Sequence, residues 1–397
     1  KGGFIGVDIF LVISGYLITS IILKEIKSTG KFSYTNFYER RVRRILPALF
    51  FIMLFSLPFA WAYLLPSDYV DFAKSILFSI GFSSNYYFHF TGLEYGATEG
   101  LLKPFLHTWS LSVEEQFYIF FPFALIISFR YLEKQLLIFI FLAFIASLIF
   151  SNYTSLYYSS LSFYSIHTRM WELLAGSILA YLEIKHETRW KFQNKFINKL
   201  LPSLGVLLIA HSILFFDENT LHPSLYTLSP IIGICLILWF AAKGEFVTKI
   251  FSSKLFVGIG LISYSLYLWH FPVFALFRYS LASGSLTKKI FLVIFIIAAS
   301  VATYFFVEKP FRNKKIINVQ KLIFNLSILL VTLVLASFYV IKNNGFKERY
   351  LFEKVNLDNG FYIKERQSHQ KIIKNPKLLS NKIKVLVIGN SQGEDFF

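Results

Sequence analysis

Ten hydrophobic segments alternate with polar connections along this chain, and its Lys and Arg residues are concentrated in every second connection. Each segment is about long enough to cross the ~30 Å hydrocarbon core of a bilayer as a helix, once the shorter ones are extended by a turn. The segments cover 4–23, 45–65, 108–129, 136–150, 168–184, 200–216, 225–242, 255–279, 289–307 and 321–341. One set of connections carries 22 Lys and Arg, and the other carries five. The positive-inside rule places the basic set in the cytoplasm, so the sequence predicts an all-α polytopic membrane protein with ten transmembrane helices.

The composition supports this class and excludes several others. Hydrophobic residues make up 55% of the chain and charged residues 16%, which is less charge than a soluble protein of 397 residues would carry. The net charge of +17 is spread over short loops and the C-terminal tail, which favours contact with anionic lipid over nucleic-acid binding. Cys235 is the only cysteine and lies in an apolar segment. We therefore expect no disulfide, no metal site and no nucleic-acid partner.

One further stretch, 72–90, is apolar enough to suggest another crossing. If it crossed, every later connection would change sides and the basic ones would face outward, against the positive-inside rule. We therefore expect 66–107 to be re-entrant or to lie on the membrane surface. With this stretch excluded, residues 1–3 lie outside, 24–44 inside, and the tail after 341 outside.

The C-terminal part of the chain differs from the rest. A membrane domain is expected over 1–320, a linking transmembrane helix over 321–341 and a polar extracytoplasmic linker over 342–383. Residues 384–397 contain a continuous apolar run followed by Gly-Asn-Ser, the pattern of a buried parallel strand and a tight turn. The sequence therefore predicts that an extracytoplasmic α/β domain begins here. Because the chain starts without Met and stops just after this strand, both ends are expected to be cut.

Four arginines precede the second hydrophobic segment, in the string FYERRVRRILPALF. On a helix Arg40, Arg43 and Arg44 would share a face and present a fork of guanidinium groups suited to phosphate, with Arg41 beside them. The alternative is a plain positive-inside anchor. Four arginines without a lysine in five positions shift the balance toward phosphate binding.

A second cluster lies in the string HTWSLSVEEQFY. His107, Ser110 and Glu114 stand at i, i+3 and i+7, so a helix would place them in one stripe. A carboxylate at the start of a transmembrane segment costs about 2–3 kcal/mol to bury, and an imidazole beside a carboxylate is suited to proton transfer. The alternative is that the acids occupy a first helical turn, where they interact favourably with the helix dipole.

Two strings near the end of the membrane domain have structural and chemical interpretations. ISYSLYLWHFPV places His270 among aromatic residues near the outer end of its segment, where an interfacial aromatic belt explains the rings. VEKPFR places Glu308 and Arg312 on either side of a proline, where a helix stop with solvated charges is the simpler interpretation.

Three more ionisable residues and a serine complete the candidates. Asp8 follows GGFIGV in the first segment, and Arg169 and Glu172 are spaced i, i+3 so that they can pair inside the bundle. A structural ion pair explains these three as well as a functional one does. Ser391 follows a predicted strand and a Gly-Asn turn, the context of an esterase-type nucleophile.

Taken together, these strings resemble the acyltransferase 3 family of bacterial membrane O-acyltransferases, in the form fused to an SGNH-hydrolase-like domain. The matching strings occur in family order and cover essentially the whole chain. They are GGFIGVDIFLVISGYLIT, FYERRVRRILPALF, HTWSLSVEEQFY, RMWELLAGSILAY, ISYSLYLWHFPV, VEKPFR and VLVIGNSQGEDFF.

The resemblance implies an O-acyltransferase, in particular an O-acetyltransferase, of the bacterial inner membrane. Such an enzyme moves an acyl group from cytoplasmic acyl-CoA to a hydroxyl of an extracytoplasmic glycan, such as O-antigen, lipopolysaccharide or peptidoglycan. Acetyl-CoA or another acyl-CoA would be the donor substrate, and no bound cofactor is implied. By the same resemblance, the CoA phosphates would be held by Arg40, Arg41, Arg43 and Arg44. The transfer path would be formed by His107, Glu114 and Glu308, and Ser391 would be the nucleophile of the attached domain.

The chain departs from the family pattern in two places. The family's key histidine lies in a transmembrane helix that precedes GGFIGVD, and an N-terminus inside the cell would likewise require one more segment before residue 1. The usual Gly-Asp-Ser-His of the SGNH block is Gly-Asn-Ser-Gln over 389–392. This change keeps the serine nucleophile but alters its surroundings.

A rival hypothesis is a multi-pass secondary transporter or glycan exporter, in which polar residues would form a translocation path. No inverted repeat and no pair of broken helices is visible in the sequence to support it. A membrane anchor without catalytic activity is weaker still, because anchoring does not need ten segments.

Overall fold

The computed structural model describes residues 2–93, 100–217, 219–242, 244–280 and 286–349, and every regular element within these ranges is helical. The longer helices are α1 (Ile5–Thr29), α2 (Tyr34–Tyr63), α5 (Thr108–Leu132), α6 (Leu136–Tyr157), α8 (Ile166–His186), α9 (Lys195–Phe215), α10 (Leu228–Phe240), α12 (Lys254–Ser280), α13 (Leu286–Thr303) and α15 (Val319–Lys342). The shorter α-helices are α3 (Pro66–Ile80), α4 (Ser84–Gly92), α7 (Ser159–Tyr164), α11 (Phe246–Phe251) and α14 (Lys309–Arg312). The predicted strand over 384–397 lies outside the described residues.

Each of the ten predicted segments coincides with a helix, and the chain is a multi-pass membrane protein. Within the described residues, seven helical stretches are long and apolar enough to cross a membrane, and one of them, Thr108–Tyr157, contains both α5 and α6. The other two predicted segments are less clear: α10 is apolar but has 13 residues, and Arg169 and Glu172 interrupt the apolar residues of α8. The exact number of crossings therefore stays a prediction.

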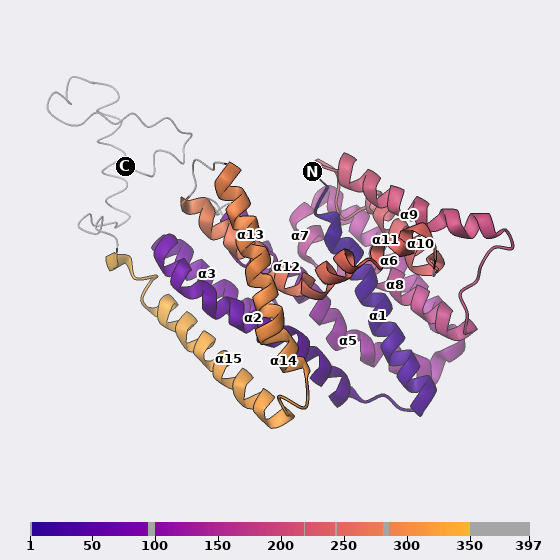
Figure 1. Ribbon diagram of the computed structural model, residues 1–397, viewed down its shortest axis with the longest axis horizontal. Helices are drawn as coiled ribbons and strands as arrows, with labels where there is room; N and C mark the ends of the chain where they lie inside the picture. The colour runs from indigo at the N-terminus through magenta and orange to yellow at the C-terminus, as the bar shows by residue number, and fades with distance from the viewer. Residues whose placement is uncertain (1, 94–99, 218, 243, 281–285, 350–397) are drawn as a thin grey trace, which may run out of the picture.

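The stretch between the second and third predicted crossings forms two short helices instead of one long one. α3 ends at a turn over 81–83, where Phe82 has a positive φ of 50°, and α4 follows. α3 lies beside α15 (Figure 1), and α4 packs against α5. These packed short helices explain why an apolar stretch here does not add a long helix to the bundle.

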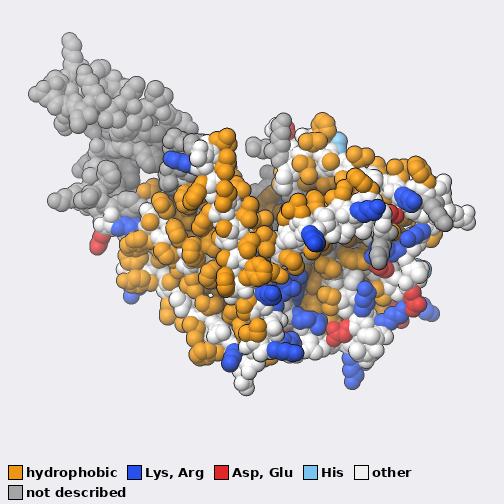
Figure 2. Space-filling model, viewed as in Figure 1, with side chains coloured by type: hydrophobic (Ala, Val, Ile, Leu, Met, Phe, Trp, Pro, Cys, Tyr) orange, Lys and Arg blue, Asp and Glu red, His pale blue; other side chains and the backbone are white. Residues whose placement is uncertain are grey.

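The helix ends lie at two opposite edges of the bundle, as the alternation of basic and non-basic connections predicts. The end of α1, the start of α2 and the turn from α14 to α15 lie together at the lower edge of Figure 1, whereas the start of α1 and the start of α13 lie at the upper edge. Most of the visible Lys and Arg side chains gather over the lower and right-hand parts, while hydrophobic side chains cover α13 and α15 (Figure 2). Large apolar residues such as Phe291 and Phe324 are exposed there. This distribution fits a bundle whose flank is covered by lipid.

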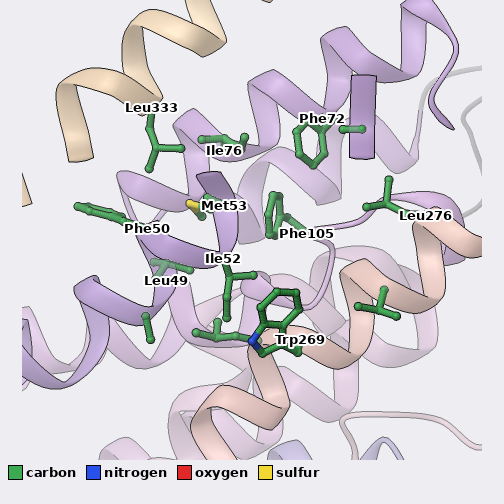
Figure 3. Close-up of a cluster of buried hydrophobic side chains, with 14 of the residues drawn as sticks. Leu49, Phe50, Ile52, Met53, Phe72, Ile76, Phe105, Trp269, Leu276 and Leu333 are labelled. Carbon is green, nitrogen blue, oxygen red and sulfur yellow. The ribbon is translucent and has the colours of Figure 1, made fainter. Parts of the chain in front are cut away.

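A hydrophobic core joins helices that are far apart in sequence. Side chains from α2, α3, α12, α13 and α15 form one buried cluster, part of which is shown in Figure 3. Trp269 of α12 lies beside Ile52 of α2, and Phe72 of α3 stacks on Phe105 at a ring-centroid distance of 5.3 Å. This core fixes α12 against α2 and so determines where the polar residues of the two helices lie.

α1 and α8 cross with their backbones in direct contact. A Cβ atom added at Gly15 would lie 1.8 Å from the carbonyl oxygen of Leu173, and one at Gly176 would lie 1.9 Å from that of Val12. Close helix contact through small residues is a common way to associate helices in a bilayer. The sequence contains both glycines in strings that it shares with the family, but it does not show that they face each other.

We expect Gly15→Ala to destabilise the protein strongly, because the added methyl group meets backbone atoms that cannot move aside independently. Overpacking of this kind costs about 1–3 kcal/mol, or more where backbone is displaced. Thermal unfolding of the detergent-purified protein would measure the change. Gly6→Ala is the matched control, since a Cβ at Gly6 of the same helix meets nothing within 4 Å. Equal unfolding temperatures for the two variants would contradict the close crossing.

Candidate functional site

A polar cluster lies inside the membrane domain, where α1, α2 and α5 meet. The carboxylate of Glu114 accepts hydrogen bonds from the hydroxyl groups of Ser14 and Tyr118. Arg41 Nη2 lies 3.6 Å from Glu114 Oε1, and the Arg41 guanidinium carbon lies 3.5 Å from the centre of the Tyr118 ring. A buried carboxylate is thus balanced by a cation and two hydroxyl donors, as charges in a membrane domain require.

Several polar atoms of this cluster make no hydrogen bond, although Arg41 Nη2 is ion-paired with Glu114. Arg41 Nε and Nη2 and Glu115 Oε1 are buried and have no hydrogen-bond partner among the described residues. Buried polar atoms are nearly always hydrogen-bonded, so such a concentration of exceptions needs an explanation. A guanidinium can bind carbonyl or phosphate oxygens, and a carboxylate can accept a proton. The cluster therefore has the groups to receive a polar molecule and to move a proton.

Arg43 is bound by the protein itself. Its Nε donates to Glu39 Oε1 at 2.8 Å, and its Nη1 donates to the carbonyl oxygens of Phe311 and Ile317 at 3.0 and 2.6 Å. The side chain is 2% exposed. Arg43 thus fastens the connection between α14 and α15 to the start of α2. Its Nη2 is the one group of the side chain without a partner in the described part of the chain.

The other two arginines of the string face outward. Arg40 is 51% exposed and lies 3.7 Å from the carboxylate of Glu25, and Arg44 is exposed. The fork predicted for Arg40, Arg43 and Arg44 is therefore not formed, because Arg43 turns into the protein while its neighbours remain at the surface. The resulting arrangement is two exposed cations at the mouth and a third, Arg41, inside.

Glu308 extends the site toward the end of α13. It is buried and ends a π-helical turn over Tyr304–Glu308, a local widening of the helix that is frequent at functional sites. Ser265 Oγ of α12 donates to Glu308 Oε1 at 2.5 Å. Arg44 interacts electrostatically with both Glu308 and Glu115, which links this carboxylate to the Glu114 cluster.

His107 lies at the start of α5 and faces different neighbours from Glu114. Its ring contacts Tyr267, His270 and Phe271 of α12, at centroid distances of 4.9, 5.5 and 5.5 Å. Ser110 bonds to the hydroxyl of Tyr267 at 3.0 Å. The predicted stripe is buried along its length, but the imidazole and the carboxylate do not touch, because His107 faces α12 and Glu114 faces α1 and α2.

The predicted Arg169–Glu172 pair is confirmed at 3.1 Å and belongs to a larger network. Arg169 Nη1 also lies 2.7 Å from Asp8 Oδ1, and His222 Nε2 lies 2.8 Å from Asp8 Oδ2. Burial lowers the pKa of the His222 imidazole from its usual value of about 6.5, and Asp8 opposes this shift. Sequence reasoning missed His222, because a histidine in a polar loop carries no signal until the fold brings it to Asp8.

The remaining sequence predictions concern Ser391 and metal binding. Ser391 falls outside the described residues, so it is not placed relative to the membrane site. Within the described part of the chain, no group of three or more His, Cys, Asp or Glu side chains could hold a metal ion.

Comparison with known proteins shows the family to which this chain belongs. Residues 2–309 match the family described as an acyltransferase domain, the acyltransferase 3 family. The chain belongs to this family. All the membrane-domain candidates, from Arg40 to Glu308, lie within the matched range.

The curated relatives carry related names. The chain is 35% identical over 333 residues to a Staphylococcus aureus (strain COL) protein named as a putative O-acetyltransferase, covering 79% of this chain and 54% of the relative. It is 28% identical over 340 residues to the peptidoglycan O-acetyltransferase OatA of Listeria monocytogenes, covering 81% and 53%. It is 28% identical over 328 residues to the O-acetyltransferase OatA of Staphylococcus aureus (strain NCTC 8325), covering 79% and 53%. The chain thus spans about half the length of these relatives. No solved structure matches it.

Proposed function

We propose that this acyltransferase-family chain is the membrane part of an O-acetyltransferase of the bacterial plasma membrane. It would take an acetyl group from acetyl-CoA in the cytoplasm and deliver it for transfer to a hydroxyl of a cell-surface glycan. The family match and the O-acetyltransferase names of the relatives support the reaction. The name of the Listeria relative makes peptidoglycan the first acceptor to test.

The observation that carries the proposal is a row of arginines that leads from the membrane surface to a buried carboxylate. Arg40 and Arg44 are exposed at the start of α2, the end that the positive-inside rule predicts to be cytoplasmic, and Arg41 of the same helix lies 3.6 Å from Glu114 inside the bundle. The phosphates of CoA are anionic and would remain with the exposed arginines. The acetyl group is neutral, so only that part of the donor would need to enter the membrane domain.

Most of the predicted residues then have a role in the proposal, except Arg43, which is held by the protein itself. Arg41, with its unused donors, would bind the acetyl carbonyl oxygen or an adjacent polar group of the donor, while Glu114 and Glu308 would accept and return protons. His107 would act farther along the path, on the extracytoplasmic side. Ser391, on the extracytoplasmic tail, would receive the acetyl group before the glycan does.

Membrane vesicles that contain the full-length protein test this proposal. In inside-out vesicles the basic loops face the added [14C]acetyl-CoA, and label should appear in peptidoglycan glycan strands enclosed in the lumen. Right-side-out vesicles with acetyl-CoA added outside should transfer no label. Transfer that required an ion gradient, or that occurred from both sides equally, would instead favour a transporter.

The double variant Arg40→Ala, Arg44→Ala is expected to raise the KM for acetyl-CoA about 10-fold or more in this assay. Each lost hydrogen bond to a charged group is worth about 1.5–3 kcal/mol. Arg278→Ala is the matched control, because Arg278 is an exposed arginine in the last turn of α12. An unchanged KM in the double variant would remove these arginines from the donor site.

A further inference from the structure

Two histidines that are far apart in the sequence meet where the start of α5 packs against α12. The rings of His107, before α5, and His270, in α12, have centroids 5.5 Å apart and planes inclined by 69°. The His107 ring also stacks on Phe271. The sequence separates these histidines by more than 160 positions, and only the packing of α12 beside the start of α5 brings them together.

The protonation of His270 is fixed by its own helix. Its Nδ1 lies 2.6 Å from the carbonyl oxygen of Tyr267. A carbonyl oxygen only accepts hydrogen bonds, so Nδ1 must carry the hydrogen. The neutral ring then holds its lone pair on Nε2, the nitrogen that points away from the helix backbone. His270 is half-buried whereas His107 is buried, so His270 is the more accessible residue of the pair.

The ring of His107 has hydrogen-bonding groups that can act beside the basic nitrogen of His270. The residue is buried, and neither of its ring nitrogens meets the geometry of a full hydrogen bond within the described ranges, although the backbone of Pro104 lies close enough to interact with the ring. Its backbone is held firmly, because its carbonyl oxygen accepts from Tyr267 Oη at 2.6 Å and from Ser110 Oγ at 3.2 Å. A neutral imidazole has one N–H and one lone pair, and a single backbone neighbour can use only one of them, so this buried ring keeps at least one group that the fold does not use.

An aromatic belt does not explain this arrangement. Belt residues sit at the interface with their polar atoms toward water, whereas the nitrogens of His107 are shut away from it. A structural histidine in a core normally uses at least one ring nitrogen. The pair therefore has unused hydrogen-bonding capacity between α5 and α12, on the buried ring of His107.

We infer that His270 is the general base of the extracytoplasmic transfer step and that His107 binds the acyl group beside it. This inference rests on the proposed function. The acceptor hydroxyl would place its hydrogen on His270 Nε2 while its oxygen bonds to the acyl carbon of an ester or thioester donor. As the bond from that carbon to the donor's oxygen or sulfur breaks, the proton passes from Nε2 to the departing atom. The N–H of His107 would hydrogen-bond the acyl oxygen, where negative charge develops.

The variant His270→Asn removes the proposed base but keeps the hydrogen bond that holds the side chain in place. The asparagine amide nitrogen occupies nearly the position of Nδ1 and can still donate to the Tyr267 carbonyl, but it provides no base at the Nε2 position. In the vesicle assay we expect kcat for transfer to fall about 100-fold or more, the usual contribution of a general base. The KM for acetyl-CoA, which is set at the other face of the membrane, should stay within about twofold of the wild-type value.

Rescue and control experiments complete the test. Added imidazole should restore part of the transfer lost in His270→Ala, because a free base can enter the vacated space. His211→Ala should transfer normally, since His211 is an exposed membrane-helix histidine on α9. Near-normal transfer by His270→Asn, or a loss in His270→Ala that imidazole does not repair, would overturn the inference. Absence of transfer by the wild-type protein would instead refute the proposed function.

Discussion

Replacing Arg169 with alanine is expected to destabilise the protein by about 3–5 kcal/mol, the usual cost of removing one partner from a buried ion pair. The Arg169 side chain is completely buried, lies between the carboxylates of Asp8 and Glu172, and donates from Nε to the carbonyl oxygen of Phe163 at 3.1 Å. Without it, two carboxylates face each other inside the bundle and one carbonyl loses its donor. Unfolding of the detergent-purified protein, followed by loss of helical circular dichroism, would measure the change.

An exposed ion pair provides the control for this prediction. Lys27 and Glu187 lie 2.6 Å apart, but their side chains are 52% and 74% exposed, so Lys27→Ala should change the stability by less than about 1 kcal/mol. A triple variant, Arg169→Met with Asp8→Asn and Glu172→Gln, should recover much of the lost stability because no uncompensated charge remains. Equal effects of Arg169→Ala and Lys27→Ala would show that the network does not hold the bundle together.

The network shows how far the sequence could predict this site. The i, i+3 spacing of Arg169 and Glu172 is a local property of a helix, and the predicted pair is present. Asp8 and His222 join it only because α1 crosses α8 through the two glycines and the loop after α9 folds back over them. No spacing rule connects residues 8, 169 and 222, so this part of the network could not be predicted.

The same limit explains the arginines and the histidines. Helical periodicity put Arg40, Arg43 and Arg44 on one face, but it could not show that Arg43 would be captured by carbonyl oxygens of the connection before α15, more than 260 positions away. For His270, the aromatic neighbours were visible in the sequence, and the decisive neighbour, His107, was not. The long helices themselves were predictable because burial in lipid imposes a continuous apolar run that tertiary contacts do not alter.

Glu114→Gln is expected to lower kcat for acetyl transfer about 100-fold or more, as loss of a group that transfers protons does. Glutamine has the same shape and can still accept a hydrogen bond from Ser14 or Tyr118, so the bundle should stay folded. It cannot take up a proton, whereas Arg41 keeps its electrostatic interaction with the neighbouring Glu115. Transfer of [14C]acetyl in inside-out vesicles, measured at equal amounts of folded protein, would give the loss.

Glu183→Gln is a closely matched control, because Glu183 also lies beside a tyrosine hydroxyl and an arginine, as Glu114 does. Glu183 accepts a hydrogen bond from the hydroxyl of Tyr16 and one from Arg189 Nε at 3.0 Å, as Glu114 does from a tyrosine beside an arginine. Its side chain is 23% exposed and lies near the end of α8, away from the arginines of α2. We expect Glu183→Gln to keep transfer within about threefold of the wild-type rate. Similar losses in both variants would mean that such triads only hold helices together, and Glu114 would then have no special part in the reaction.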